Sequence, residues 1–165
     1  MKNLYLIRHA KSSWADLSLR DEDRPLNARG KMDAPRMAEF LADRLVAVDA
    51  FVTSPAKRAK ATAKHFASAF GLSKEDLIYN EKLYHASTDD ILEAVFQFEN
   101  DWDHVFLFGH NPGFTYFANY FAKEAIANVP TCGIVHITTD VEKWTDFDYK
   151  SGKLSNFYYP KMFNK

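Results

Sequence analysis

The sequence predicts an α/β fold of three layers, with helices on both faces of a mostly parallel central sheet and room for an antiparallel edge. Short apolar runs alternate with segments of helical periodicity, the order in which parallel strands and crossover helices follow one another. Two late strand-like segments, Gly133 to Thr138 and Leu154 to Tyr159, are separated by a polar turn region, which favours antiparallel pairing. With 165 residues, a single domain spanning 1–165 is expected.

The first strand is expected over Asn3 to Ile7, where alternating apolar residues end in the polar pair Arg8-His9. A charged loop follows from Lys11 to Leu26. Helical spacing of apolar residues then predicts a helix from about Ala28 to Val46. Pro35 fits this helix if it lies in the first turn or marks a kink.

The second strand is expected over the apolar residues Ala50 to Thr53. Ser54-Pro55 then offers an N-cap hydroxyl followed by a proline at the first helical position, so a helix is expected from there to about Phe70. Gly71 suits the end of that helix, and Leu77 to Tyr79 forms the next short strand.

The next helix is capped by Ser87 or Thr88, since four apolar residues after them share one helical face. His104 to Phe108 is the strongly apolar fourth strand, and an aromatic helix from about Phe114 to Ala122 comes after it. The five phenylalanines of this region follow apolar periodicity without interleaved basic residues, so we expect them in the core and not in a base-stacking surface. They are Phe106, Phe108, Phe114, Phe117 and Phe121.

Charge and composition narrow the function classes. The net charge is −1 and both signs are mixed along the chain, so no nucleic-acid or membrane partner is expected. The apolar run near the N-terminus is too short for a signal peptide, which favours the cytoplasm. Cys132 is the only cysteine and is interpreted as a small apolar residue near a strand start.

Polar residues gather where three of the predicted strands end. Arg8-His9 ends the first strand, Arg58 lies one helical turn after the Ser54-Pro55 pair, and His110-Asn111 follows the fourth strand. Because ligands bind beyond the carboxyl ends of parallel strands, all of these residues are expected in one crevice. Guanidinium groups bind phosphate oxygens in bidentate fashion, and a neutral imidazole is a competent nucleophile. The positive surroundings are expected to lower the pKa of His9 and keep its lone pair free.

These segments resemble the histidine phosphatase superfamily, and the short chain with its Asp23-to-Gly30 loop resembles the SixA-type phosphohistidine phosphatase branch. The matching segments are Leu6 to Ala10, Thr53 to Ala63 and Gly109 to Pro112. The resemblance implies that His9 is the phosphorylated nucleophile, that Arg8 and Arg58 hold the phosphoryl oxygens, and that His110 assists as a donor. It also implies that Asn111 contacts the substrate and that no metal or cofactor is needed.

The sequence departs from the family pattern in two places. Ala10 stands where the family usually has glycine, which restricts the backbone slightly. No clear match exists to the glutamate general acid of many family members, and Glu81 and His85 are candidates, with Asp89 and Asp90 in the same region. An alkoxide leaving group needs such an acid, whereas the imidazole of a phosphohistidine can be protonated beforehand.

The favoured function is therefore a cofactor-free phosphatase that acts through phospho-His9 on a phosphorylated protein carrying phosphohistidine. One alternative is a phosphomonoesterase for a small phosphorylated substrate, such as a sugar phosphate or nucleotide, which would need an acid near the leaving atom. A non-catalytic module that only holds phosphorylated partners is the other alternative. A mutase is the least favoured, because it must retain and reorient a bisphosphate.

Overall fold

The computed structural model describes residues 1–45 and 47–163, and these residues form one six-stranded sheet in the order β3-β2-β4-β1-β5-β6. The strands are β1 (Lys2–Arg8), β2 (Ala50–Thr53), β3 (Leu77–Tyr79), β4 (His104–Gly109), β5 (Ile134–Thr139) and β6 (Gly152–Tyr158). The first four run parallel, whereas β5 is antiparallel to β1 and β6 to β5. The predicted parallel sheet with an antiparallel edge is confirmed.

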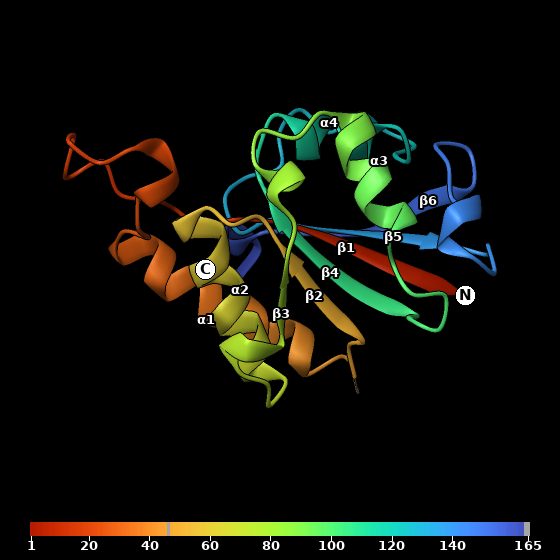
Figure 1. The fold of residues 1–165 in the computed structure, drawn as a ribbon, viewed down its shortest axis with the longest axis horizontal. Helices are drawn as coiled ribbons and strands as arrows, with labels where there is room; N and C mark the ends of the chain where they lie inside the picture. Colours follow the sequence, from red (N-terminus) through yellow and green to blue (C-terminus); the bar gives the residue numbers. More distant parts are fainter. Residues whose placement is uncertain (46, 164–165) are drawn as a thin grey trace.

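Helices cover both faces of this sheet. They are α1 (Ala28–Ala42), α2 (Lys57–Ala69), α3 (Thr88–Phe96) and α4 (Gly113–Asn119). Figure 1 shows α1 and α2 on one face and α3 and α4 on the other, with the loop between β1 and α1 extending beyond the sheet. None of the helices in the described residues is long and apolar enough to cross a membrane.

The two faces of the sheet bury separate cores, because side chains alternate along each strand. On β1, Leu4 and Leu6 belong to the core beneath α3 and α4, whereas Tyr5 and Ile7 belong to the core beneath α1 and α2. Strand β4 divides its residues in the same way. All five phenylalanines predicted to be core residues are buried: Phe106, Phe108, Phe114, Phe117 and Phe121.

Several predicted boundaries were wrong. Helix α1 ends at Ala42, short of the predicted end at Val46, which lies outside the described residues. Pro35 lies inside α1 and not in its first turn. Helix α4 ends at Asn119 instead of Ala122. Just beyond it, the carbonyl of Phe121 accepts from the backbone N–H of Leu154 in β6 and so bonds to the sheet instead of continuing the helix.

Candidate active site

The order of the strands brings the predicted site residues together. β4 lies between β2 and β1, so the strands that precede Arg58, His110 and His9 are immediate neighbours. Their carboxyl ends point the same way because all three are parallel. The imidazole rings of His9 and His110 lie with their centroids 5.2 Å apart. The strand ends that carry the predicted site residues therefore lie side by side at one edge of the sheet.

The backbone beside His9 fixes its imidazole. Nδ1 lies 2.8 Å from the carbonyl oxygen of Ala10. Because a carbonyl oxygen only accepts, Nδ1 carries the proton and Nε2 keeps the lone pair. No described residue bonds Nε2. The N–H of Ala10 in turn donates to Oγ1 of Thr62 at 2.9 Å, and the Thr62 hydroxyl donates to the carbonyl of Arg58 at 2.8 Å, so α2 anchors the backbone next to His9.

The environment keeps His9 neutral. Burial lowers the pKa of His9 to about 3, and the positive charges of Arg58, Arg8 and Arg24 act in the same direction against the opposing bond to Ala10. The predicted direction of this shift is confirmed, although burial is a larger cause than the arginines named from the sequence. At neutral pH the ring has a free lone pair, as a nucleophile requires.

His110 has one bonded and one unbonded ring nitrogen. Its Nε2 lies 2.8 Å from Oγ of Ser54, and burial together with the neighbouring His9 and Arg58 lowers the pKa of His110 to about 3. Nδ1 of His110 and Nε of Arg8 are buried without a hydrogen-bond partner among the described residues. A buried polar nitrogen without a partner costs free energy, so these two point to a ligand with acceptor oxygens.

The backbone between α4 and β5 holds Nη1 of Arg8. This nitrogen donates to the carbonyl of Val129 at 2.9 Å, in the segment between α4 and β5. Asn111 supports that segment, since its Nδ2 donates to Oδ1 of Asn128 at 2.8 Å and to the carbonyl of Val129 at 3.0 Å. Its Oδ1 accepts from the N–H and hydroxyl of Thr115. Contact between Asn111 and substrate stays a prediction, while its observed bonds order the backbone that holds Arg8.

A sequence model of the histidine phosphatase superfamily (branch 1) matches residues 4–90, which include His9, Arg58 and His85. The chain belongs to the histidine phosphatase superfamily. An uncharacterized protein of Mycobacterium tuberculosis is 30% identical over 165 residues, covering 94% of this chain and 100% of that protein. An uncharacterized chloroplastic protein of Arabidopsis thaliana is 28% identical, covering 92% of this chain and 72% of that protein.

A solved relative supports the same family. A protein of Agrobacterium tumefaciens, provisionally named phosphohistidine phosphatase SixA, superimposes with a TM-score of 0.80 at 28% identity. The match covers 96% of this chain and 98% of the other. The resemblance noted in the sequence is thereby confirmed at the level of the family and its SixA-like structures.

Asp21 organises two basic residues of this histidine phosphatase site, Arg58 and Arg24, a role not predicted from the sequence. The backbone carbonyl of Asp21 accepts from Nη1 of Arg58 at 2.7 Å, and its Oδ2 accepts from Nη2 at 2.9 Å. Oδ1 accepts from Nη1 of Arg24 at 3.0 Å, and the Tyr84 hydroxyl donates to Oδ2 at 2.6 Å. The available signal was the Asp-x-x-Arg-Pro-Leu pattern from Asp21 to Leu26.

These contacts decide the protonation of both partners of the Asp21–Tyr84 bond. Burial acts to raise the pKa of Asp21, but the bonds from Tyr84, Arg58 and Arg24 outweigh it and hold that pKa well below its usual range. Burial and the Asp21 carboxylate raise the pKa of Tyr84 to about 12. Asp21 is therefore a carboxylate at neutral pH and cannot serve as the general acid.

Ser54 does not cap α2, contrary to the prediction. The N-cap residue is Ala56, with no side-chain cap, and α2 begins at Lys57. Ser54 is fully buried, its Oγ accepts the N–H of Ala56 at 3.2 Å, and the same oxygen bonds His110. The neighbouring strand end supplies a partner that local helix-capping rules do not consider.

The candidate general acids differ in their exposure and in the residues that they contact. Glu81 is exposed in a short 3₁₀ turn, whereas the His85 ring centroid lies 4.0 Å from that of Tyr84, which packs edge-on against His110. The carboxylate of Asp89 accepts from the Tyr149 hydroxyl, and that of Asp90 belongs to the capping box of α3, so both carboxylates have hydrogen-bond partners away from His9. A general-acid role for Glu81 or His85 stays a prediction. In the described residues, no three His, Cys, Asp or Glu side chains group as metal ligands.

Proposed function

We propose that this protein is a phosphatase that removes the phosphoryl group of protein phosphohistidine through a phospho-His9 intermediate. The observation that carries the proposal is the state of His9, whose Nδ1 is bonded to the Ala10 carbonyl while its neutral ring leaves Nε2 unbonded. A module that only binds phosphate needs no such nucleophile. The SixA-like structural relatives support this choice within the family.

In the first step, Nε2 of His9 attacks the phosphorus of a substrate phosphohistidine whose ring is protonated. The N–P bond of the substrate breaks, the electron pair returns to the leaving nitrogen, and the substrate departs as neutral imidazole. His9 then carries the phosphoryl group on Nε2 and keeps its proton on Nδ1, bonded to Ala10. The guanidiniums of Arg8 and Arg58 stabilise the negative oxygens as the phosphoryl group passes.

In the second step, a water oxygen attacks the phosphorus of phospho-His9. The bond to Nε2 breaks, His9 leaves as neutral imidazole, and the two protons of the water remain on the released dihydrogen phosphate. Neither step consumes a proton from a carboxylic acid. His110 donates from Nδ1 to a phosphoryl oxygen when the Ser54 hydroxyl donates to its Nε2, because a neutral imidazole has one N–H.

Phosphohistidine is favoured over a phosphate ester because of the leaving group. An alkoxide must be protonated as it leaves, and the carboxyl group bonded within the site, Asp21, is ionised. An imidazole leaving group arrives already protonated near neutral pH. The site therefore has the nucleophile and cations that phosphohistidine needs and does not depend on a further acid.

The test measures phosphate release from a phosphohistidine peptide and from p-nitrophenyl phosphate in parallel. We expect wild type to prefer the peptide, His9→Ala to lose activity, and His65→Ala, a histidine outside the site on α2, to keep it. Brief reaction with substrate should label His9 with an acid-labile phosphoryl group, detectable by mass spectrometry.

Two other outcomes would replace the proposal. Preference for the ester, with a loss of activity in His85→Gln, would make the protein a phosphomonoesterase with His85 as its acid. Tight binding of the phosphopeptide without turnover of either substrate would make it a binding module.

A further inference from the structure

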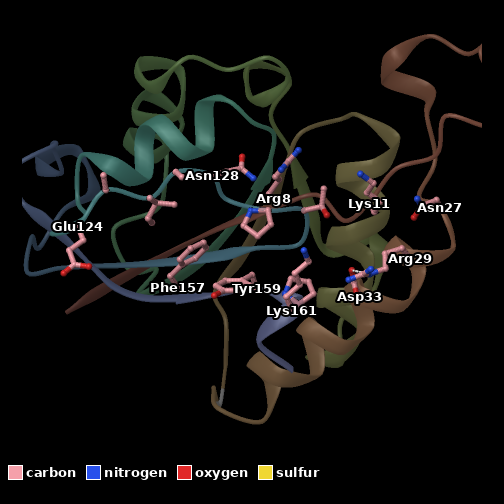
Figure 2. A pocket seen from close by; sticks show the side chains of 16 residues that line it. Arg8, Lys11, Asn27, Arg29, Asp33, Glu124, Asn128, Phe157, Tyr159 and Lys161 are labelled. Atoms are coloured by element: carbon pink, nitrogen blue, oxygen red, sulfur yellow. Dashed lines mark hydrogen bonds and ion pairs between the residues drawn. The ribbon is translucent and has the colours of Figure 1, made fainter. Parts of the chain in front are cut away.

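A cavity of about 970 Å³ begins at Arg8 and extends away from the nucleophile, since its lining includes Arg8 but not His9, Arg58 or His110. Its walls come from the segment after α4, from the end of β6 with the residues that follow it, and from the start of α1. Figure 2 shows Arg8 between an end with Lys11 and Arg29 and an opposite end with Glu124. The cavity is thus continuous with one of the two arginines that hold the phosphoryl group.

The end of the cavity near Lys11 is positively charged. Arg29 is neutralised by Asp33, a buried carboxylate whose Oδ2 lies 3.2 Å from Nε of Arg29. Lys11 and Lys161 are exposed, and neither ammonium has an ion-pair partner in the part of the chain that the structure describes. Two unpaired cations beside Arg8 favour carboxylates in whatever fills this end.

Between Lys11 and Glu124, part of the cavity wall is apolar. Phe157 and Tyr159 line it with ring centroids 5.2 Å apart and planes inclined by 51°, and Ile126 and Pro130 add aliphatic surface. All four side chains are only partly buried, so a bound ligand that covers them gains hydrophobic binding free energy. Because the two rings are inclined to each other, they suit branched apolar side chains better than a single flat base.

We propose that this cavity binds the polypeptide segment next to the phosphohistidine of a protein substrate. An acidic residue of that segment lies between Lys11 and Lys161, and an apolar one covers Phe157 and Tyr159. The volume exceeds what one histidine side chain fills, so neighbouring residues of the substrate must contribute. Since this occupant is the substrate of the proposed function, the assignment rests on that function.

The test compares two phosphohistidine peptides that differ only in having glutamate or glutamine beside the phosphohistidine. We expect the acidic peptide to have a KM about tenfold lower with equal kcat, because two partly screened ion pairs are involved. The double variant Lys11→Glu/Lys161→Glu should abolish that preference. Lys153→Glu, an exposed lysine of β6 outside the cavity, is the matched control.

A binding measurement separates this inference from the proposed function. Isothermal titration calorimetry with the unphosphorylated acidic and neutral peptides needs no turnover. Binding of the acidic peptide that the double variant loses supports the cavity assignment even if phosphohistidine is not hydrolysed. Equal KM values for both peptides in an active wild type overturn the assignment and leave the proposed function standing. Tight binding of adenosine monophosphate, lost in the double variant, would assign the cavity to a nucleotide instead.

Discussion

Replacing Asp21 by asparagine tests whether this acidic residue, which was not predicted from the sequence, positions Arg58. The variant keeps the size of the side chain and the backbone carbonyl that accepts from Arg58, but it removes the negative charge shared by Arg58, Arg24 and Tyr84. The new amide also brings a donor to a place where every partner donates.

The magnitude follows from the exposure of the partners. The side chains of Arg58 and Arg24 are 6% and 8% exposed, whereas that of Asp21 is 39% exposed. Charge-assisted hydrogen bonds contribute about 1.5–3 kcal/mol each when protected, but solvent screens this carboxylate, so we expect a total loss of about 1–2 kcal/mol of unfolding free energy. A misplaced Arg58 should lower kcat/KM by roughly 10- to 100-fold.

The assay measures kcat/KM on the phosphohistidine peptide and the melting temperature for wild type, Asp21→Asn and Asp16→Asn. Asp16 belongs to the same loop, but its carboxylate accepts from the N–H and hydroxyl of the exposed Ser18, so its variant should behave like wild type. For Asp21→Asn, the melting temperature should fall by about 2–8 °C. Unchanged kcat/KM in a folded Asp21→Asn variant would refute the idea that Asp21 positions Arg58.

The pH dependence of the same variant has a definite sign. The folded pKa of Asp21 lies below its unfolded value of 3.8, so its stabilisation is present above that pH and is lost as the pH falls through the folded pKa. The stability difference between wild type and Asp21→Asn should therefore be constant from pH 7 to 5 and shrink below pH 4, as followed by urea unfolding.

Three further predictions concern the same centre. Ser54→Ala should lower kcat/KM by about tenfold, measured by phosphate release, because His110 loses the partner of its Nε2. His9 and His110 have folded pKa values of about 3 against 6.5 unfolded, so unfolding takes up protons and stability falls as the pH drops below 6.5. Urea unfolding measures how far the unfolding free energy falls between pH 7 and pH 5. This decrease should be about 2 kcal/mol smaller in His9→Gln than in wild type. Gly113→Ala should destabilise by about 1–3 kcal/mol in thermal melts, since a Cβ there would clash with the carbonyl of Ala86.

Local sequence patterns were sufficient to predict the sheet and its site-bearing strand ends. Strands β2 and β3 have the predicted boundaries, and β4 extends one residue further. Gly71 follows the end of α2 with a φ of 76°, the conformation that makes glycine suitable there. Helix ends were predicted less well, because they depend on where tertiary contacts take over from local periodicity.

The sequence by itself determined which polar residues lie at the carboxyl ends of neighbouring strands, because His9, Arg8, Arg58 and His110 each come at or soon after the end of a strand with a clear apolar pattern. Only the tertiary structure decided what surrounds them. It brought Asp21 to Arg58, made Ser54 a partner of His110 instead of a helix cap, and formed the cavity beside Arg8. The physical reason is that these contacts join residues distant along the chain, whereas periodicity and capping rules describe neighbours.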